Sequence, residues 1–521
     1  MVYNTCGKLD FRERHGKYME TISRKFLQTA HFPEDVAVGP LEEMPVKVMQ
    51  FGEGNFLRAF VDWLINEINR KDLFCGSVVV VQPLEKGMVD MLNAQDDIYT
   101  LYLRGVENGK VTVSKNIVTA IKDAINPYTQ WDRYLEYAKG EQLRFIISNT
   151  TEAGIEFKEE PYTKGVCQNT YPAKLTALLY ERYQAFHGDK DKGLVIIPCE
   201  LIDRNGDHLK DAVMKYAQLW NLGEEFVEWI QTACAFMNTL VDRIVPGFPR
   251  DEFDALTKEQ GYLDNLIVTA EIFHFWVIEG DKKYAEEIPF HKAGLNVLWT
   301  DNMEPYRTRK VRILNGAHTM TVLAAYLCGL DTVGECMKDA DIRPFMEKGI
   351  FEQIIPTFKL AEEEKQMFAK AVLERFENPF IKHMLLSISL NSVSKYKVRV
   401  LPSVEGYIQR FGTIPSNTVF ALAALIAFYR GTKTEDGKYM GAREGNTYEI
   451  CDMPEILAFF EDAWKKYDQN HNVQELVEAV LKNQGFWEQD LTKIPGLSAK
   501  VCEYLENILT KGMREAVKQL F

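Results

Sequence analysis

The stretch "VKVMQFGEGNFLRAF" (residues 46–60) decides the fold class. Residues 46–51 have the apolar content of a short strand, a turn with two glycines follows, and the apolar residues after it recur with helical spacing. Strand, glycine turn and helix form the layout of a dinucleotide site, in which Gly52 permits the tight turn and Gly54 the close approach of a pyrophosphate. Leu57 stands where the general fingerprint has a third glycine, so this stretch alone fits a plain turn equally well.

Three further apolar runs predict additional strands: "SVVVVQP" (77–83), "RFIISNTTEAG" (144–154) and "GLVIIPCELID" (193–203). Continuous apolar strands that alternate with helices are typical of a parallel sheet covered on both faces. From about Glu271 onward the apolar residues mostly follow a helical period, and "VPGFPRDEF" (245–253) suggests a break between the two patterns.

The expected fold class is therefore α/β, with a Rossmann-like dinucleotide-binding domain followed by a mostly α-helical C-terminal domain. We place a peripheral N-terminal segment at residues 1–43, the Rossmann-like domain at 44–255 and the helical substrate and catalytic domain at 256–521.

Composition excludes several classes of partner. The net charge of −14 argues against a nucleic-acid surface. The nine cysteines form no C-x-x-C pair and the nine histidines no H-E-x-x-H motif, so no metal site is expected. The N-terminus lacks the apolar core of a signal peptide. The most apolar helical run, Val419–Tyr429, is shorter than the ~20 residues that span a bilayer. We expect a cytoplasmic protein with reduced thiols, no membrane partner, and a buried core helix at 419–429.

The predicted strand at 77–82 ends at Gln82, where a carboxylate often binds the adenosine ribose of a dinucleotide. A carboxamide can also form a hydrogen bond with a ribose hydroxyl. No arginine stands beside Gln82 to neutralise a 2′-phosphate, and the nearest basic residue is Lys86. This pattern favours NAD over NADP.

The stretch "KVRILNGAH" (310–318) combines a lysine, an asparagine and a histidine. On an α-helix at ~100° per residue, Lys310, Asn315 and His318 fall at about 0°, 140° and 80°, so all three can border one cleft. Oxidation of an alcohol needs a base for the hydroxyl proton and donors for the oxyanion that forms as hydride leaves. An ordinary amphipathic helix with a solvated lysine is the alternative that the spacing leaves open.

Four separate stretches, in the same order along the chain, carry a resemblance to a known family. They are "FGEGNFLRAF" (51–60), "TLVDRIVP" (239–246), "PYRTRKVRILNGAH" (305–318), and "RFENP" (375–379) followed by "SVSKYKVRVLPSV" (392–404). With these, the chain resembles the polyol-specific long-chain dehydrogenases, the mannitol dehydrogenase family, from about Val46 to beyond residue 405.

The resemblance implies metal-independent, NAD(P)-linked oxidation of a secondary alcohol on an open-chain sugar derivative. It implies that Lys310 is the base and that Asn315 and His318 are the oxyanion donors. NAD is the expected cofactor. The residues expected to bind it are Phe51, Gly52, Gly54, Asn55, Phe56, Gln82, Asn149 and Asp242.

One segment departs from the family pattern. Mannitol-type members have an asparagine in an S-C-D-N segment, whereas this chain reads "PCELIDRNGD" (198–207) with Leu201 at that position. Together with "SNTTEAGI" (148–155), this segment resembles a branch of the family that acts on hexuronates. That branch implies reversible hydride transfer between NADH and the ketone of D-tagaturonate, giving D-altronate, in hexuronate (galacturonate) breakdown.

Two alternatives stay open. Within the family, the chain could be a fructuronate reductase (mannonate oxidoreductase) or a mannitol or polyol 2-dehydrogenase, because pocket shape sets the substrate. Outside it, a non-catalytic nucleotide-binding sensor would be expected to have lost some of Lys310, Asn315 and His318, and all three are present.

A hexuronate or aldonate substrate carries a carboxylate, so a basic group is expected near its pocket. The candidates are Arg375, Lys395, Arg399 and Arg309, each of which could instead form a surface ion pair. We expect Arg375, Lys395 and Asn238 to bind substrate. The sequence gives no prediction of the oligomeric state.

Overall fold

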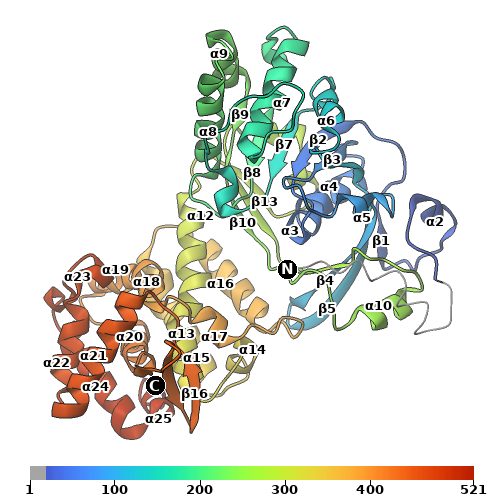
Figure 1. Cartoon of the computed structure of the whole chain (residues 1–521). Helices are drawn as coiled ribbons and strands as arrows, with labels where there is room; N and C mark the ends of the chain where they lie inside the picture. The colour runs from blue at the N-terminus through green and yellow to red at the C-terminus, as the bar shows by residue number, and fades with distance from the viewer. Residues whose placement is uncertain (1–18) are drawn as a thin grey trace. The chain divides into compact units, whose positions relative to one another are not determined.

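The computed structural model describes residues 19–521, which form two compact units (Figure 1). The sheet unit contains the described residues up to Arg104 and residues 112–303. The helical unit contains residues 105–111 and 304–521. The division after Met303 lies later than the expected boundary at 255/256, because strands β11 (Val268–Glu271), β12 (Phe275–Glu279) and β13 (Val297–Thr300) form sheets of the sheet unit.

The expected peripheral segment at 1–43 lies partly outside the described residues, since residues 1–18 are not described. Its remaining part contains helix α2 (Arg24–Thr29) and strand β1 (Val36–Val38). Strand β1 pairs in parallel with β5 (Lys110–Val118), so this part of the chain belongs to a sheet.

The main sheet of the sheet unit has six strands in the order β6-β3-β2-β7-β8-β9, and every neighbouring pair is parallel. Their bounds are β2 Val46–Phe51, β3 Ser77–Val81, β6 Ile121–Ile125, β7 Phe145–Ser148, β8 Val195–Pro198 and β9 Ala235–Phe236. This is the strand order of a dinucleotide-binding Rossmann sheet, whose order reverses between β2 and β7. Ligands bind such sheets outside the carboxyl ends of the strands at that reversal.

Successive residues of these strands enter different cores, as the two-residue period of a strand requires. Val78 and Val80 pack in a core with helix α4 (Val61–Asn69). Val79 and Val81 pack in a second core with helices α6 (Trp131–Tyr137), α7 (Tyr171–Ala185), α8 (Asn205–Leu219) and α9 (Glu224–Ala233). Both faces of the sheet are thus covered, which explains why its strands are continuous apolar runs.

Two smaller sheets complete the strands of this unit. One has the order β1-β5-β4-β11 and includes β4 (Tyr99–Glu107). The other has the order β10-β12-β13, with β10 (Asn238–Asp242) antiparallel to β12 and β12 parallel to β13. Trp276 and Ile278 of β12 are fully buried in the core that also holds Val78 and Val80.

The helical unit is built around two buried helices, α13 (Gly316–Leu327) and α20 (Ser416–Phe428), which pack together. The prediction of a buried core helix at 419–429 is confirmed. Other elements of this unit are α12 (Glu304–Arg309), α16 (Glu362–Phe376), α18 (Ser392–Arg399), α19 (Leu401–Phe411), α21 (Pro454–Asn470), α22 (Val473–Leu481), α24 (Leu497–Lys511), and a sheet of β14 (Gly431–Lys433), β15 (Tyr439–Arg443) and β16 (Asn446–Glu449).

The predicted fold class is confirmed: a Rossmann-like parallel sheet, then a mostly helical C-terminal part. Among residues 19–521, none of the helices is both long enough and apolar enough to span a bilayer.

Candidate active site

The glycine turn after strand β2 needs glycine at its first position. Gly52 has a φ of +121°, and a Cβ there would lie 2.8 Å from the backbone oxygen of Asn149. A Cβ on Gly54, in contrast, would meet no atom of the described residues within 4 Å apart from its two chain neighbours. The turn therefore closes tightly over strand β7 at Gly52, and at Gly54 its backbone is open to a ligand.

Arg58, which the sequence analysis did not select, fixes the shape of this turn. Its guanidinium is buried and donates to the carbonyl oxygens of Glu53 (3.2 Å) and Leu266 (2.7 Å) and to Oδ1 of Asn55 (2.8 Å). The side chain of Asn55 in turn packs against Gly247. The arginine of the quoted "GNFLRA" stretch was the signal for this role, because an arginine in an apolar helix start needs buried acceptors.

The predicted cofactor residues Phe56 and Asn149 line a pocket of about 250 Å³ in the sheet unit. Asn149 follows β7 and donates from Nδ2 to the carbonyl of Cys199 (2.8 Å). The other lining residues are Thr151, Glu200, Leu201 and Val241. The pocket contains residues that follow β7 and β8, so it lies at the carboxyl ends of the strands, where Rossmann sheets bind their ligands.

Glu200 is a buried carboxylate at this pocket that the sequence analysis did not select. It accepts hydrogen bonds from the hydroxyls of Ser148 (3.1 Å) and Thr150 (3.0 Å) and from the backbone N–H of Thr150 (3.0 Å). Desolvation raises its pKa, and these hydrogen bonds act in the opposite direction. Leu201, next to it, has 67 % of its surface exposed, so an apolar side chain borders the pocket.

Two predicted cofactor residues have buried side chains. Phe51 is fully buried and packs against Tyr171 with ring centroids 4.6 Å apart, so only its backbone can face a ligand. Gln82 donates from Nε2 to the carbonyls of Leu84 (2.8 Å) and Glu85 (3.0 Å), and its Oε1 accepts from the N–H of Val89 (3.3 Å). Gln82 thus orders the loop after β3, and only a second lone pair on Oε1 remains for a ribose hydroxyl.

Asn238 and Asp242 lie at opposite ends of strand β10. Asn238 is buried; its Oδ1 accepts from the N–H of Asp207 (3.1 Å), and its Nδ2 donates to Glu279 (3.4 Å). Its carboxamide thus binds the start of helix α8 rather than facing the pocket lined by Val241. Asp242 is buried at the other end of the strand. The guanidinium of its neighbour Arg243 donates to three backbone carbonyls.

In the helical unit, the prediction of a single α-helix through residues 310–318 is wrong. Residues Lys310–Asn315 form a π-helical turn between α12 and α13, and the N–H of Gly316 donates to the carbonyl of Val311, five residues earlier. Because such a turn closes over five residues instead of four, Lys310 and Asn315 lie closer to one face than the ~140° of an α-helix allows. π-turns inside α-helices are frequent at functional sites.

The structure places the three predicted catalytic residues on this short segment. Lys310 and Asn315 are half-buried, and His318 is 8 % exposed. The His318 ring stacks on Phe376 with centroids 4.3 Å apart and meets the His383 ring edge-on at 5.1 Å. Within the described chain, Nε2 of His318 is buried without a hydrogen-bond partner. This buried polar atom fits a ligand oxygen, because an unsatisfied buried polar group is otherwise costly.

Burial lowers the pKa of His318 well below its ordinary value, and four nearby basic groups lower it further. In order of their effect, these groups are His383, Arg375, Arg399 and Lys395. His318 is therefore neutral at physiological pH. Two residues predicted to bind substrate, Arg375 and Lys395, thus lie near His318, and His383 is a further member that the sequence analysis missed.

Arg309, another basic candidate, has different surroundings. Its guanidinium lies over the rings of Phe368 (4.4 Å) and Tyr306 (5.4 Å). It is not among the four charges with the largest effect on the pKa of His318. We call His318, His383, Arg375, Lys395 and Arg399 the basic cluster.

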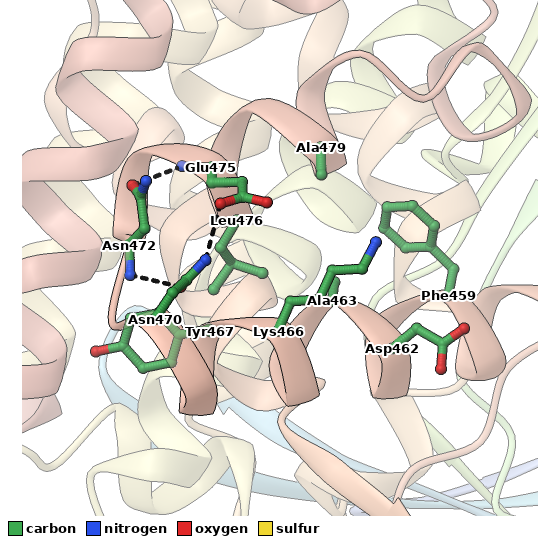
Figure 2. A pocket seen from close by; sticks show the side chains of 10 residues that line it. All are labelled: Phe459, Asp462, Ala463, Lys466, Tyr467, Asn470, Asn472, Glu475, Leu476 and Ala479. Carbon is green, nitrogen blue, oxygen red and sulfur yellow. Dashed lines mark hydrogen bonds between the residues drawn. The ribbon is translucent and has the colours of Figure 1, made fainter.

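A separate groove of about 190 Å³ lies between helices α21 and α22 (Figure 2). None of the predicted site residues lines it. Its polar groups are bonded to one another at the helix junction: Asn470 donates to the Glu475 carboxylate (2.8 Å), and Asn472 accepts from the Glu475 N–H (3.1 Å). Residues 19–521 contain no cluster of three or more histidine, cysteine or acidic residues that could hold a metal.

Comparison with family models identifies the class of protein. The mannitol dehydrogenase Rossmann domain matches residues 46–292, and the mannitol dehydrogenase C-terminal domain matches residues 302–509. The chain belongs to the mannitol dehydrogenase family and is an oxidoreductase of that family. The resemblance inferred from the four quoted stretches is thereby confirmed.

Its curated relatives include the altronate oxidoreductase of Bacteroides thetaiotaomicron, 46% identical over 479 residues, which cover 92% of this chain and 98% of the relative. The altronate oxidoreductase of Escherichia coli O6:K15:H31 is 46% identical over 504 residues, which cover 96% of this chain and 100% of the relative.

Two solved structures share the fold. D-sorbitol dehydrogenase in substrate-free form matches with a TM-score of 0.75 at 22% identity, covering 95% of this chain and 100% of that chain. Pseudomonas fluorescens mannitol 2-dehydrogenase, in a ternary complex with NAD and D-mannitol, matches with a TM-score of 0.65 at 20% identity, covering 96% and 99%.

Proposed function

We propose that this chain interconverts D-tagaturonate and D-altronate with NAD(H), by metal-independent hydride transfer in which Lys310 is the general acid and base. The observation that carries this proposal is the basic cluster around the neutral, buried His318. It surrounds a proposed oxyanion donor with positive charge, which favours an acidic sugar in a chain whose net charge is −14. The 46% identity to altronate oxidoreductases along nearly the whole chain supports the same substrate.

NAD is the proposed cofactor, and the geometry of the sheet unit fits it. The open position at Gly54 leaves room for a pyrophosphate against the backbone. The pocket with Phe56 and Asn149 lies at the strand ends where a Rossmann sheet binds nucleotides. The neighbouring carboxylates of Glu53 and Glu85 disfavour the extra phosphate of NADP. Reduced NAD, when bound, supplies the hydride. Side chains of this protein transfer the proton and stabilise the negative charge that develops on the substrate oxygen.

In the reducing direction, Lys310 donates a proton to the ketone oxygen as hydride reaches the carbon. Asn315 is suited to stabilise the developing negative charge, because its carboxamide makes no intramolecular hydrogen bond within the described residues. His318 donates its single ring proton to the same oxygen. Donors that are held in place before charge develops stabilise it most strongly.

The neutral state of His318 supports the proposal that the lysine transfers the proton. Burial and the surrounding positive charges oppose protonation of the imidazole, so at neutral pH it acts as a hydrogen-bond donor and not as an acid. Lys310 is the remaining group of the triad that can give and take a proton. In the oxidising direction it must be deprotonated to accept the alcohol proton.

The proposed place of this reaction is hexuronate (galacturonate) breakdown in the cytoplasm. The eight cysteines in the described part of the chain are all free thiols, which suits a reducing compartment. The substrate is an open-chain uronate or aldonate. No nucleic acid or membrane takes part in the proposed function.

The test is oxidation of NADH by the purified protein with D-tagaturonate, D-fructuronate and D-fructose in parallel. We expect kcat/KM to be at least tenfold higher for D-tagaturonate than for the other two. A preference for D-fructuronate would instead support the fructuronate reductase alternative. A preference for D-fructose would support a polyol dehydrogenase, and no turnover of any of the three would support a non-catalytic role.

A further inference from the structure

Helix α18 presents two basic side chains, Lys395 and Arg399, on one face, since residues four apart on a helix are neighbours. Nζ of Lys395 donates to the carbonyl of Ile388 (2.8 Å), and Nη1 of Arg399 donates to Oγ1 of Thr319 (3.4 Å). Neither forms an ion pair with a carboxylate in residues 19–521. Like charges at this spacing destabilise a helix, so the pair is suited to share an anion.

One acidic residue, Asp452, acts on the charge of Lys395. Desolvation lowers the pKa of Lys395, the Arg399 charge lowers it further, and Asp452 acts in the opposite direction. The carboxylate of Asp452 already accepts a hydrogen bond from the hydroxyl of Tyr429. Desolvation alone lowers the pKa of Arg399.

The backbone fixes Arg399 beside the catalytic segment. A Cβ on Gly316 would lie 3.2 Å from the carbonyl oxygen of Arg399, so glycine permits the end of α18 to approach the first turn of α13. Gly316 directly follows Asn315, and Thr319, which accepts from Arg399, directly follows His318. Arg399 is therefore held against the residues that directly follow the two proposed oxyanion donors.

We propose that Arg399, assisted by Lys395, binds the carboxylate of the substrate and determines specificity for an acidic over a neutral sugar. This inference rests on the proposed function and deepens it. An arginine fork matches a carboxylate with two parallel N–H donors. An open-chain hexuronate has its ketone and its carboxylate towards opposite ends. Asn315 and His318 are the proposed donors to the ketone oxygen, and helix α18 provides the donors to the carboxylate.

The test compares Arg399→Met with Lys397→Met, using NADH oxidation with D-tagaturonate and with D-fructose. Lys397 is on the same helix but pairs with Glu488 (2.7 Å), so its substitution removes an equal charge outside the basic cluster. We expect Arg399→Met to raise KM for D-tagaturonate by roughly 10- to 100-fold, as expected for loss of a charged hydrogen-bonded partner. KM for D-fructose should change less than about threefold, and Lys397→Met should leave both values unchanged.

Two further variants separate binding from folding. Arg399→Lys, which keeps the charge but loses the fork, should raise KM for D-tagaturonate by an intermediate amount. Thr319→Val removes the acceptor of Arg399 Nη1 and keeps the charge of Arg399. It should raise KM for D-tagaturonate slightly and leave KM for D-fructose unchanged. This variant tests the proposal even if Arg399→Met does not fold.

Equal effects of Arg399→Met on both substrates, or no effect on either, would overturn the assignment while leaving the proposed function intact. A wild-type protein that reduces D-fructose but not D-tagaturonate would overturn both. The wild-type protein therefore tests the proposed function, and the variants test the role of Arg399 separately.

Discussion

The glycine turn of the sheet unit and the Lys310–His318 segment of the helical unit satisfy their polar groups in opposite ways. At the turn, Arg58 and Gln82 donate hydrogen bonds to backbone carbonyls. Among residues 19–521, Nε2 of His318 on the catalytic segment is buried without a partner, and Arg399 of the neighbouring helix α18 makes one long side-chain hydrogen bond, to a hydroxyl. The donors of Arg58 and Gln82 are thus used within the protein, whereas the second region leaves a donor for a ligand.

This difference indicates where each kind of specificity resides. A turn whose backbone carbonyls are held by Arg58 and Gln82 presents a fixed backbone, which suits a cofactor common to a large family. Buried donors without acceptors cost stability, and they suit the variable part of the reaction, the substrate. Variants in the two regions should therefore differ: those at the turn affect cofactor binding or folding, and those on the segment affect turnover with little change in stability.

The largest of these effects is expected for Asn315→Ala. The Asn315 side chain is half-buried, and its loss removes a proposed oxyanion donor without breaking a side-chain hydrogen bond within residues 19–521. Loss of one such donor lowers kcat by roughly 10²–10³-fold. We expect this drop in steady-state kcat with D-tagaturonate, with KM for NADH and the melting temperature unchanged. A loss expressed only in KM for NADH would place Asn315 with the cofactor.

A pair of glycine variants tests the turn. Gly54→Ala adds a methyl group where no protein atom lies within 4 Å, so the melting temperature should be unchanged. If a pyrophosphate lies against this backbone, the same methyl group should weaken NADH binding by about tenfold or more.

Gly52→Ala is the matched control for that pair. It adds a methyl group 2.8 Å from the oxygen of Asn149 at a φ of +121°, so it should lower the melting temperature as well as NADH affinity. Calorimetry and NADH fluorescence titration distinguish the two variants. Unaltered NADH binding in Gly54→Ala would exclude a cofactor at this turn.

Cofactor preference should follow the charges of the loop after β3. The Glu53 carboxylate accepts from the N–H of Met88, and Glu85 stands in the same loop, with Lys86 as the nearest basic residue. Two carboxylates close to a 2′-phosphate repel it. We expect kcat/KM to be about tenfold higher with NADH than with NADPH. A tenfold preference for NADPH would reverse the assignment.

The smallest functional effect is expected at Asp62, a fully buried acid linked to the turn through Gln50. Desolvation raises its pKa from 3.8 to about 7. The Asp62 carboxyl thus loses its proton at lower pH in the unfolded protein than in the folded protein. The stability that protonated Asp62 contributes to the folded state is fully present below pH 4 and is lost as pH rises towards 7.

Asp62→Asn removes this penalty. We expect the variant to gain roughly 2–4 kcal/mol at pH 8 and almost nothing at pH 4, with kcat unchanged. Thermal melts of wild type and variant at both pH values measure the difference. A gain that does not depend on pH would contradict the titration of Asp62.

The sequence predicted the parallel sheet well because its strands are buried on both faces and are therefore unbroken apolar runs. It did not predict that β11–β13 continue the sheet unit, since these strands are short and their pairing with β4 and β10 is set by contacts distant in sequence. The expected domain boundary consequently fell before them.

The candidate site was predicted in part. The motif stretches contain Lys310, Asn315, His318, Arg375 and Lys395, and the structure brings the last two near His318. The π-turn was missed because its sequence is that of an α-helix.

Two further features of the site were not accessible from sequence. Burial of the Gln82 carboxamide depends on a loop conformation that no short pattern encodes. His383 was missed because it lies between two motifs and reaches His318 only through the packing of the helical unit.

The most direct test of the central claim is the turnover of Lys310→Ala with D-tagaturonate and NADH at pH 7. We expect a loss in kcat of at least about 10²–10³-fold, with partial recovery when a small primary amine is added or the pH is raised. A near wild-type rate would contradict the assignment of the proton to Lys310.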